Sequence, residues 1–219
     1  IINHKTYVLA GDGCLMEGIS HEAMSLAGHL KLKNLVMLFD NNSISIDGPT
    51  SLAVSDNFKK RFESYGWDYI LINGHNEKEI FKALKKVQNA KRPTVISCKT
   101  KIGYGSPNKS GKASSHGSPI GVDEIKLVRK ALNWQHKPFE VPKNILNEWR
   151  KIGYKSTKLV ATWNKIYKNK KHVVNKVFKN NFSKILKSEK QNSIKEKKSL
   201  ASRKASELTL NALTKKNNT

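Results

Sequence analysis

Two short polar motifs contain residue types that could bind a hard metal ion. Asp12 lies between two glycines in Gly11-Asp-Gly13, and Asn41-Asn42 follows a later apolar run. Carboxylate and amide oxygens are the ligands that Mg²⁺ and Ca²⁺ prefer, and they are poor ligands for zinc. A Gly-Asp-Gly turn or an Asn-Asn loop is ordinary by itself. Placed at the ends of neighbouring strands of one parallel sheet, however, the two motifs could meet and hold a cation.

The same motifs could also hold a diphosphate. Mg²⁺ usually takes only a few protein ligands, and phosphate oxygens and water complete its octahedral shell. The backbone carbonyl of Ile44 could be a third protein ligand. Gly13 has no side chain, so its backbone can approach a phosphate closely. A helix that begins near Ser20 would direct the positive end of its dipole towards the same place.

The elements that must position these motifs follow from the apolar pattern. Four β-branched or apolar runs predict strands, at residues 6–10, 35–39, 68–72 and 93–98. Four helices are predicted at residues 20–29, 56–65, 76–90 and 123–132, with Ser20 and Asp56 as N-caps of the first two. The run at 35–39 is apolar throughout, which is typical of a strand buried on both faces. Strand and helix alternate, and this predicts an α/β fold in which a parallel sheet has helices on both faces.

Polar segments follow the predicted strands at the edge where an α/β sheet binds its ligands, at residues 11–13, 40–48 and 99–121. The last segment is rich in Gly, Ser, Lys and Pro, and such long loops are usually functional or disordered. The strand pattern ends near residue 136, and a Lys-rich, mainly helical stretch follows. We therefore expect an α/β domain at 1–135, a helical linker at 136–198 and the start of a further domain at 199–219.

The composition excludes some classes of protein. Lys and Arg number 41 against 17 Asp and Glu, a formal net charge of +24, and 37% of the residues are hydrophobic. No apolar run approaches the roughly 20 residues that cross a bilayer, so no membrane partner is expected. Cys14 and Cys98 are too few for a disulfide framework or a metal cluster, and they fit a reducing cytoplasm. The chain begins at Ile1 rather than Met, so we expect its true N-terminus to lie upstream.

The excess of Lys could also indicate a nucleic-acid-binding module. Most of the excess lies between Lys143 and Lys204, interleaved with Asn and Ile. Nucleic-acid interfaces usually combine Arg with exposed aromatic residues, whereas Trp149, Trp163 and Tyr167 are spaced as in the buried stripe of a helix. We therefore favour a solvated Lys-rich face. Only weak, non-specific binding that falls steeply with salt is expected.

Several segments resemble one enzyme family. The segments Gly11-Asp-Gly-Cys-Leu-Met-Glu-Gly-Ile-Ser-His-Glu22 and Asp40-Asn-Asn-Ser-Ile-Ser-Ile-Asp-Gly48 resemble the diphosphate-binding motif of thiamine diphosphate enzymes, the transketolase family in particular. Further matching segments follow in order at residues 61–67, 73–75, 99–109, 116–121 and 202–206. The resemblance is close over about residues 3–150, lapses in the Lys-rich linker and returns at 201–206. It implies the thiamine diphosphate-binding fold.

The resemblance implies roles for the residues of the first two motifs. Asp12, Asn42 and the carbonyl of Ile44 correspond to the Mg²⁺ ligands. Gly13 and Asn42 correspond to contacts of the thiamine diphosphate. Ile46 corresponds to an apolar wall beside the thiazolium ring of the cofactor. Ca²⁺ is a plausible substitute for Mg²⁺ because it takes the same oxygen ligands.

Other residues correspond to the substrate side of the family's site. His116 corresponds to the catalytic histidine that contacts both cofactor and sugar, and Arg203 to an arginine whose forked guanidinium binds the substrate phosphate. Lys99 matches a lysine near the site and Glu17 an acid at the subunit contact. The remaining histidines that fall in or near matching segments are interpreted as structural: His21, His29 and His75.

The activity that the resemblance implies is transfer of a two-carbon ketol group from a ketose phosphate to an aldose phosphate, within the pentose phosphate pathway. The family enzyme is a homodimer, longer than this chain, and its cofactor is activated by a glutamate that we expect to lie outside this chain. We therefore expect the isolated chain to be inactive in ketol transfer. Two alternatives stay open: a related enzyme such as dihydroxyacetone synthase, and an inactive cofactor-binding fragment.

Overall fold

A four-stranded parallel sheet forms the centre of the part of the chain that carries the motifs. The computed structural model describes residues 3–178, 182–196 and 199–215, and these divide into two compact units, within 2–140 and within 141–219. The sheet has the order β1-β2-β6-β5, and its strands are β1 (Thr6–Gly11), β2 (Leu35–Asn41), β5 (Asp68–Asn73) and β6 (Thr94–Lys99). All neighbouring strands pair in parallel, as the alternation of strand and helix predicts.

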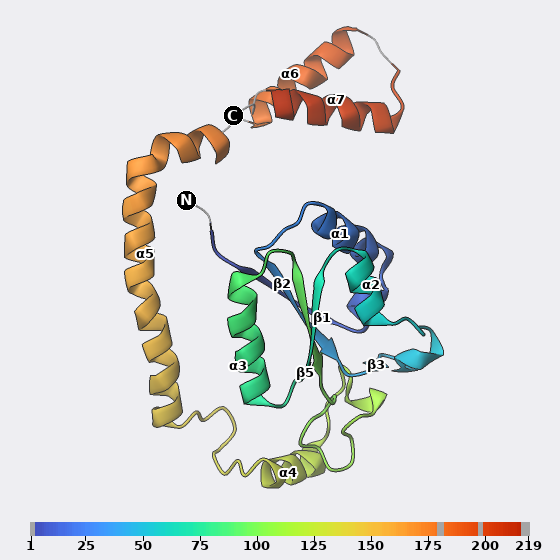
Figure 1. Cartoon of the computed structure of the whole chain (residues 1–219), viewed down its shortest axis with the longest axis vertical. Helices are drawn as coiled ribbons and strands as arrows, with labels where there is room; N and C mark the ends of the chain where they lie inside the picture. Colours follow the sequence, from blue (N-terminus) through green and yellow to red (C-terminus); the bar gives the residue numbers. More distant parts are fainter. Residues whose placement is uncertain (1–2, 179–181, 197–198, 216–219) are drawn as a thin grey trace. The chain divides into compact units, whose positions relative to one another are not determined.

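Helices cover both faces of this sheet (Figure 1), which confirms the predicted α/β fold. On one face the core includes Met24 of α1 (Gly18–His29) and Phe62 of α2 (Phe58–Ser64). On the other face Ala83 of α3 (Glu77–Lys86) packs against Val36 of β2. Val36 and Phe39 are fully buried and belong to the cores on opposite faces. Strand β2 is therefore buried on both sides, as its continuous apolar run predicts.

The two predicted helix caps are wrong. Helix α1 begins at Gly18 with Glu17 as its N-cap residue, and the Ser20 hydroxyl instead donates to the carbonyl of Cys14, 2.6 Å away. Helix α2 is capped by Asn57, whose side-chain oxygen accepts the Lys60 N–H at 3.0 Å. A cap must sit immediately before the first helical residue to reach the third N–H. Asp56 lies one residue too early for that geometry and forms an ion pair with Arg61.

The second unit is helical, as expected for the Lys-rich stretch that follows the α/β domain. It consists of α5 (Lys143–Phe178), α6 (Phe182–Lys195) and α7 (Ser202–Lys215), and α6 packs against α7. Trp149 and Trp163 in α5 are 70% and 45% exposed, so the expectation of a buried aromatic stripe is wrong. Trp163 stacks on Tyr167 of the same helix, with 5.1 Å between the ring centres. Spacing places aromatic residues on one helix face, but burial requires another element to cover that face.

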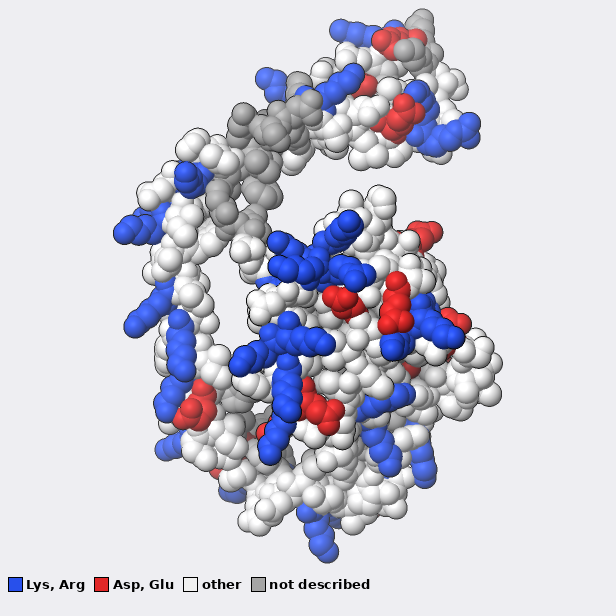
Figure 2. Space-filling model, in the orientation of Figure 1, with Lys and Arg blue, Asp and Glu red and all other residues white. Residues whose placement is uncertain are grey.

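Positive side chains are spread over the face of the molecule that Figure 2 shows. In this view, each of the two units carries Lys and Arg side chains, and Asp and Glu side chains lie among them. Within the described ranges, no helix combines the length and the apolar character that a membrane span requires. The positive charge is therefore a general surface property on this face, as a solvated Lys-rich surface predicts.

A long loop, residues 100–121, joins β6 to α4 (Val122–Ala131) and is anchored by a buried carboxylate. Glu124, in the first turn of α4, is only 7% exposed. Its carboxylate accepts hydrogen bonds from the Ser106 hydroxyl and from both the backbone and the side-chain N–H of Asn108, the latter two at 2.9 Å. These donors stabilise the ionised form and lower the pKa of Glu124 to about 2.

Gly28→Ala should destabilise the α/β unit because Gly28 lies where α1 meets the turn after α2. A Cβ at residue 28 would lie 1.6 Å from the carbonyl oxygen of Tyr65. We expect the free energy of unfolding to fall by about 1–3 kcal/mol or more, measured as a lower urea midpoint. Gly18→Ala is the control, since a Cβ there meets no atom within 4 Å, and its effect should stay below about 1 kcal/mol. Equal midpoints for the two variants would contradict the close approach.

Glu124 should stay ionised in acid, and the Ser106 hydroxyl should be the main reason. Its pKa is lowered from an ordinary 4.5 to about 2, so its stabilising contribution is complete above the ordinary value and is lost as the pH falls through about 2. Carboxyl ¹³C NMR should show Glu124 ionised at about pH 3.5. In Ser106→Ala the protonation should move to higher pH, whereas Ser118→Ala, at an exposed position of the same loop, should not move it. An unchanged titration in Ser106→Ala would refute this explanation.

Candidate functional site

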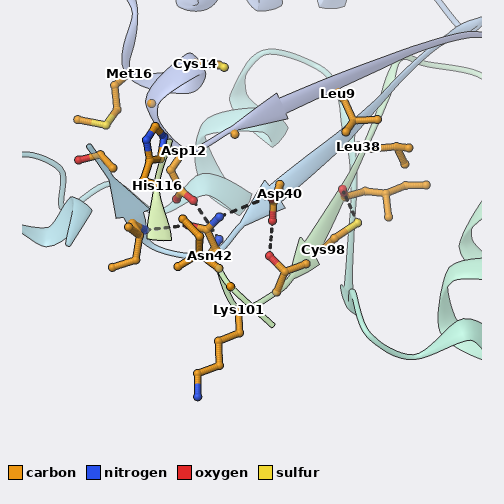
Figure 3. Close-up of a pocket in the computed structure, with 18 of the residues that line it drawn as sticks. Leu9, Asp12, Cys14, Met16, Leu38, Asp40, Asn42, Cys98, Lys101 and His116 are labelled. Carbon is orange, nitrogen blue, oxygen red and sulfur yellow. Dashed lines mark hydrogen bonds between the residues drawn. The ribbon is translucent and has the colours of Figure 1, made fainter. Parts of the chain in front are cut away.

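A cavity of about 990 Å³ lies at the carboxyl edge of the sheet and is lined by residues from all three predicted polar segments. Figure 3 shows Asp12, Asn42 and His116 together on one side of the cavity and the apolar Leu9 and Leu38 on the other. Ligand sites of open parallel sheets are found at this edge. The cavity therefore combines a polar end, built by loops, with an apolar end, built by the strands and α3.

Asp12 connects the ends of two neighbouring strands. It is 3% exposed, and its Oδ2 accepts the backbone N–H groups of Asn42 at 2.9 Å and Ser43 at 3.0 Å. Its Oδ1 is buried and has no hydrogen-bond partner among the described residues. Burial raises the pKa of Asp12 above its ordinary value, against the opposing effect of the two N–H donors. A cation at Oδ1 would supply the missing partner and favour the ionised carboxylate.

The turn after β2 brings Asn42 and Ile44 beside Asp12. The side-chain oxygen of Asn42 accepts the Ile44 N–H at 2.9 Å, and its amide nitrogen lies 3.4 Å from a carboxylate oxygen of Asp40. Ser43 between them has a φ of 63°, a left-handed conformation that costs energy for residues other than glycine and is often found at functional sites. The Thr100 hydroxyl in turn donates to Asp40. The turn is thus held by hydrogen bonds within the protein.

Gly13 leaves space at the polar end of the cavity. It follows Asp12, begins the short 3₁₀ helix η1 (Gly13–Met16) and lines the cavity. A Cβ at Gly13 would meet no atom within 4 Å, so a side chain there would occupy space that is otherwise open. Helix α1 then begins at Gly18, and its N-cap residue Glu17 also lines the cavity. Backbone N–H groups at a helix start suit an anion such as a diphosphate.

The structure brings two further predicted residues to the same cavity. Ile46 is 71% exposed, in the turn of the hairpin formed by β3 (Ile44–Ser45) and β4 (Gly48–Pro49), and it lines the cavity. This hairpin was not expected from the sequence. His116 lies near the end of loop 100–121, is exposed and also lines the cavity. Both positions are compatible with the roles that the resemblance implies.

Lys99 and Arg203 are placed differently. Lys99 is not among the lining residues, and its amine donates to the side chain of Asn41 at 2.9 Å. Asn41 is buried and donates to the hydroxyl of Ser97, so Lys99 is held at the edge of the sheet. Arg203 is exposed in the first turn of α7, in the second unit. Its contact with a substrate phosphate, like the subunit-contact role of Glu17, stays a prediction.

Several lining residues were not identified as site residues from the sequence, and His75 is the clearest example. Its Nε2 accepts the Lys101 N–H at 3.0 Å, and its ring stacks on Tyr104 with 4.0 Å between the ring centres. The structural interpretation of His75 therefore describes its contacts, although it also lines the cavity. The family resemblance at residues 73–75 was the sequence signal that could have identified His75 as a site residue.

Cys98 also lines the cavity. Burial and the charge of Asp40 raise the pKa of its thiol and make it a poor nucleophile.

Comparison with known proteins identifies the family. Residues 1–190 match the family model described as the thiamine diphosphate-binding domain of transketolase. The transketolase of Buchnera aphidicola subsp. Acyrthosiphon pisum is 44% identical over a match that covers 96% of this chain and 33% of the relative. Transketolase 1 of Pasteurella multocida is 52% identical over 151 residues, which cover 68% of this chain and 23% of the relative.

Solved structures give the same result. The crystal structure of transketolase from Campylobacter jejuni matches with a TM-score of 0.74 and 37% identity. This match covers 84% of the present chain and 30% of the Campylobacter jejuni chain. Transketolase from Pichia stipitis in complex with sedoheptulose 7-phosphate matches with a TM-score of 0.73 and 34% identity. This match covers 78% of the present chain and 26% of the Pichia stipitis chain. This chain spans about a quarter to a third of the length of the curated relatives it matches. From its sequence and from its fold, the chain belongs to the transketolase family and carries its thiamine diphosphate-binding domain.

Proposed function

We propose that this chain provides the Mg²⁺–thiamine diphosphate site of a transketolase, which transfers a two-carbon ketol group from a ketose phosphate to an aldose phosphate. The observation that carries the proposal is the buried Oδ1 of Asp12, which has no partner among the described residues. A buried carboxylate oxygen without a partner is costly. A bound cation would remove that cost, and a diphosphate would balance the charge of the cation.

The donor set fits Mg²⁺. Asp12, Asn42 and the carbonyl of Ile44 would hold the metal, since all three are hard oxygen donors on two adjacent loops. Ca²⁺ takes the same oxygens and is a candidate substitute. Gly13 and Asn42 would contact the diphosphate. The open space at Gly13 and the start of η1 support this part of the proposal.

The remaining roles concern the reacting end of the cofactor. When bound, thiamine diphosphate supplies a nucleophilic carbon and an electron sink for cleaving and forming the bond next to a carbonyl group. Ile46 would provide an apolar contact for its thiazolium ring. His116 would contact the cofactor, hydrogen-bond to the sugar and hold or move a proton there, which imidazole is suited to do. Arg203 would bind the phosphate of the substrate.

The organisation of the whole protein is part of the proposal. We assign residues 1–135 to the diphosphate-binding domain, 136–198 to a linker and 199–219 to the start of the pyrimidine-binding domain. The complete enzyme is proposed to be a homodimer that acts on sugar phosphates in the pentose phosphate pathway. Two free cysteines, Cys14 and Cys98, support a reducing cytoplasmic location.

Asp12→Asn should abolish cofactor-dependent stabilisation without unfolding the chain. The variant keeps an oxygen for the N–H groups of Asn42 and Ser43, so its stability without Mg²⁺ should stay within about 1 kcal/mol of wild type. At cofactor concentrations near 100 times Kd, wild type should gain about 2.7 kcal/mol, or about 5–10 °C in Tm. Asp12→Asn should gain nothing. Thermal melts with thiamine diphosphate and Mg²⁺ or Ca²⁺ measure this.

Asp47→Asn is the matched control for this substitution. Asp47 is exposed and lines the same cavity but is not a proposed ligand. It removes the same charge and should retain most of the stabilisation by the cofactor. A wild-type chain that gains no stability from Mg²⁺ and thiamine diphosphate would refute the proposed cofactor site, and so would equal losses in both variants.

Cofactor binding and turnover should separate in this chain. No glutamate of the chain can be assigned the role of activating the cofactor, so we expect the purified 219-residue chain to bind thiamine diphosphate and to show no ketol transfer. Measurable turnover by the purified chain would show this expectation to be wrong. In the complete enzyme, ribose 5-phosphate should be the better acceptor than formaldehyde. The reverse preference would favour dihydroxyacetone synthase.

A further inference from the structure

The turn at residues 106–109 of loop 100–121 is held by hydrogen bonds to one buried side chain, Glu124. Glu124 accepts three hydrogen bonds from Ser106 and Asn108, and Ser106 is itself only 5% exposed. A buried carboxylate with several donors is a strong anchor because each of its hydrogen bonds is charge-assisted. One residue of α4 therefore fixes the turn at the centre of the loop.

The hydrogen bonds continue from this turn to the residue before His116. The Ser106 hydroxyl accepts the Lys109 N–H at 3.1 Å, and the Lys109 carbonyl accepts the Ser115 hydroxyl at 2.6 Å. Ser115 also lies close to the backbone of Gly103, near the start of the loop. A Cβ added at Gly103 would be only 2.9 Å from the Oγ of Ser115. The backbone N–H of His116 donates to the Ala113 carbonyl at 2.8 Å. A continuous path of contacts thus joins Glu124 to the backbone of His116.

The loops that would hold the metal ion are fixed by other contacts. Asp12 and Asn42 are joined directly to each other, and the path of contacts from Glu124 to His116 passes through neither of them. Loop 100–121 has a separate anchor at its start, where His75 accepts the Lys101 N–H. Loss of Glu124 should therefore release the part of the loop that ends at His116 and leave the residues around Asp12 in place.

We propose that Glu124 is a positioning residue that holds His116 at the cavity through Ser106, Lys109 and Ser115. The functional meaning of this placement rests on the proposed function, in which His116 contacts both the cofactor and the sugar. The charge of Glu124 is used to order a loop before ligand binding, which is a general means of preorganising a site. Glu124 itself is not expected to touch substrate or cofactor.

Glu124→Gln in the 219-residue chain tests this proposal, with Asp123→Asn as the matched control. Asp123 is the neighbouring acid of α4, its side chain is 95% exposed, and it pairs with Lys126 on the surface. We expect hydrogen-exchange protection at residues 106–116 to fall about tenfold or more in Glu124→Gln. The ¹H–¹³C NMR signal of the His116 imidazole should shift or broaden. Protection in β1 and β2 should stay near wild type. The affinity for thiamine diphosphate with Mg²⁺ should fall far less than in Asp12→Asn, because Asp12 and Asn42 stay in place.

Ser106→Ala provides a second route, because it interrupts the same path and should also change the His116 signal. In the double variant the effects should not add, since both changes act through one chain of contacts. An unchanged His116 signal in Glu124→Gln would overturn the proposal, and so would an equal loss of protection in β1 and β2. Failure of the proposed function is a separate result: wild type would then not bind thiamine diphosphate, whatever Glu124→Gln does to the loop.

Discussion

The two carboxylate oxygens of Asp12 differ in their hydrogen bonding, and the site depends on this difference. Oδ2 is satisfied by two backbone N–H groups of the loop after β2, whereas Oδ1 is buried and unpartnered among the described residues. The parallel pairing of β1 with β2, in which Gly11 is opposite Asp40, places both loops at one edge. The sheet register thus determines which atoms meet. The unsatisfied oxygen is a cost that the fold tolerates where a cation would bind.

Two different physical devices order the loops around the cavity. The loops that follow β1 and β2 are short and are joined through the buried Asp12 and the tight turn at Ser43. The loop between β6 and α4 is long and polar, and it is ordered by His75 near its start and by Glu124 near its centre. A long loop loses more conformational entropy than a short loop when it becomes ordered. Buried, charge-assisted anchors compensate for that cost.

The net charge of +24 is the most conspicuous feature of the composition, yet it contributes little to the site. Within the part of the chain that the structure describes, Lys101 is the one Lys or Arg side chain that lines the cavity, and the rest of the polar lining is mostly glycines, carboxylates and the amide of Asn42, beside apolar residues of the sheet and α3. Family membership likewise rests on the match over residues 1–190 and not on the abundance of Lys. Surface charge affects solubility and non-specific association, while function depends on the placement of particular atoms.

Much of the fold and part of the site were determined by the sequence alone. The strands and the position of the ligand edge follow from local apolar patterns, and the chemistry of Asp12 and Asn42 follows from their residue types. The cap of α2 was missed because one residue of displacement, from Asp56 to Asn57, decides which side chain reaches the helix N–H groups. Only the tertiary structure decided the unpartnered oxygen of Asp12 and the burial of Glu124. Asp12 accepts the backbone N–H of Asn42, and Glu124 accepts the backbone N–H of Asn108. These donors are 30 and 16 residues away along the chain. Local sequence patterns cannot predict such hydrogen bonds, because the folded backbone determines which donor reaches which carboxylate.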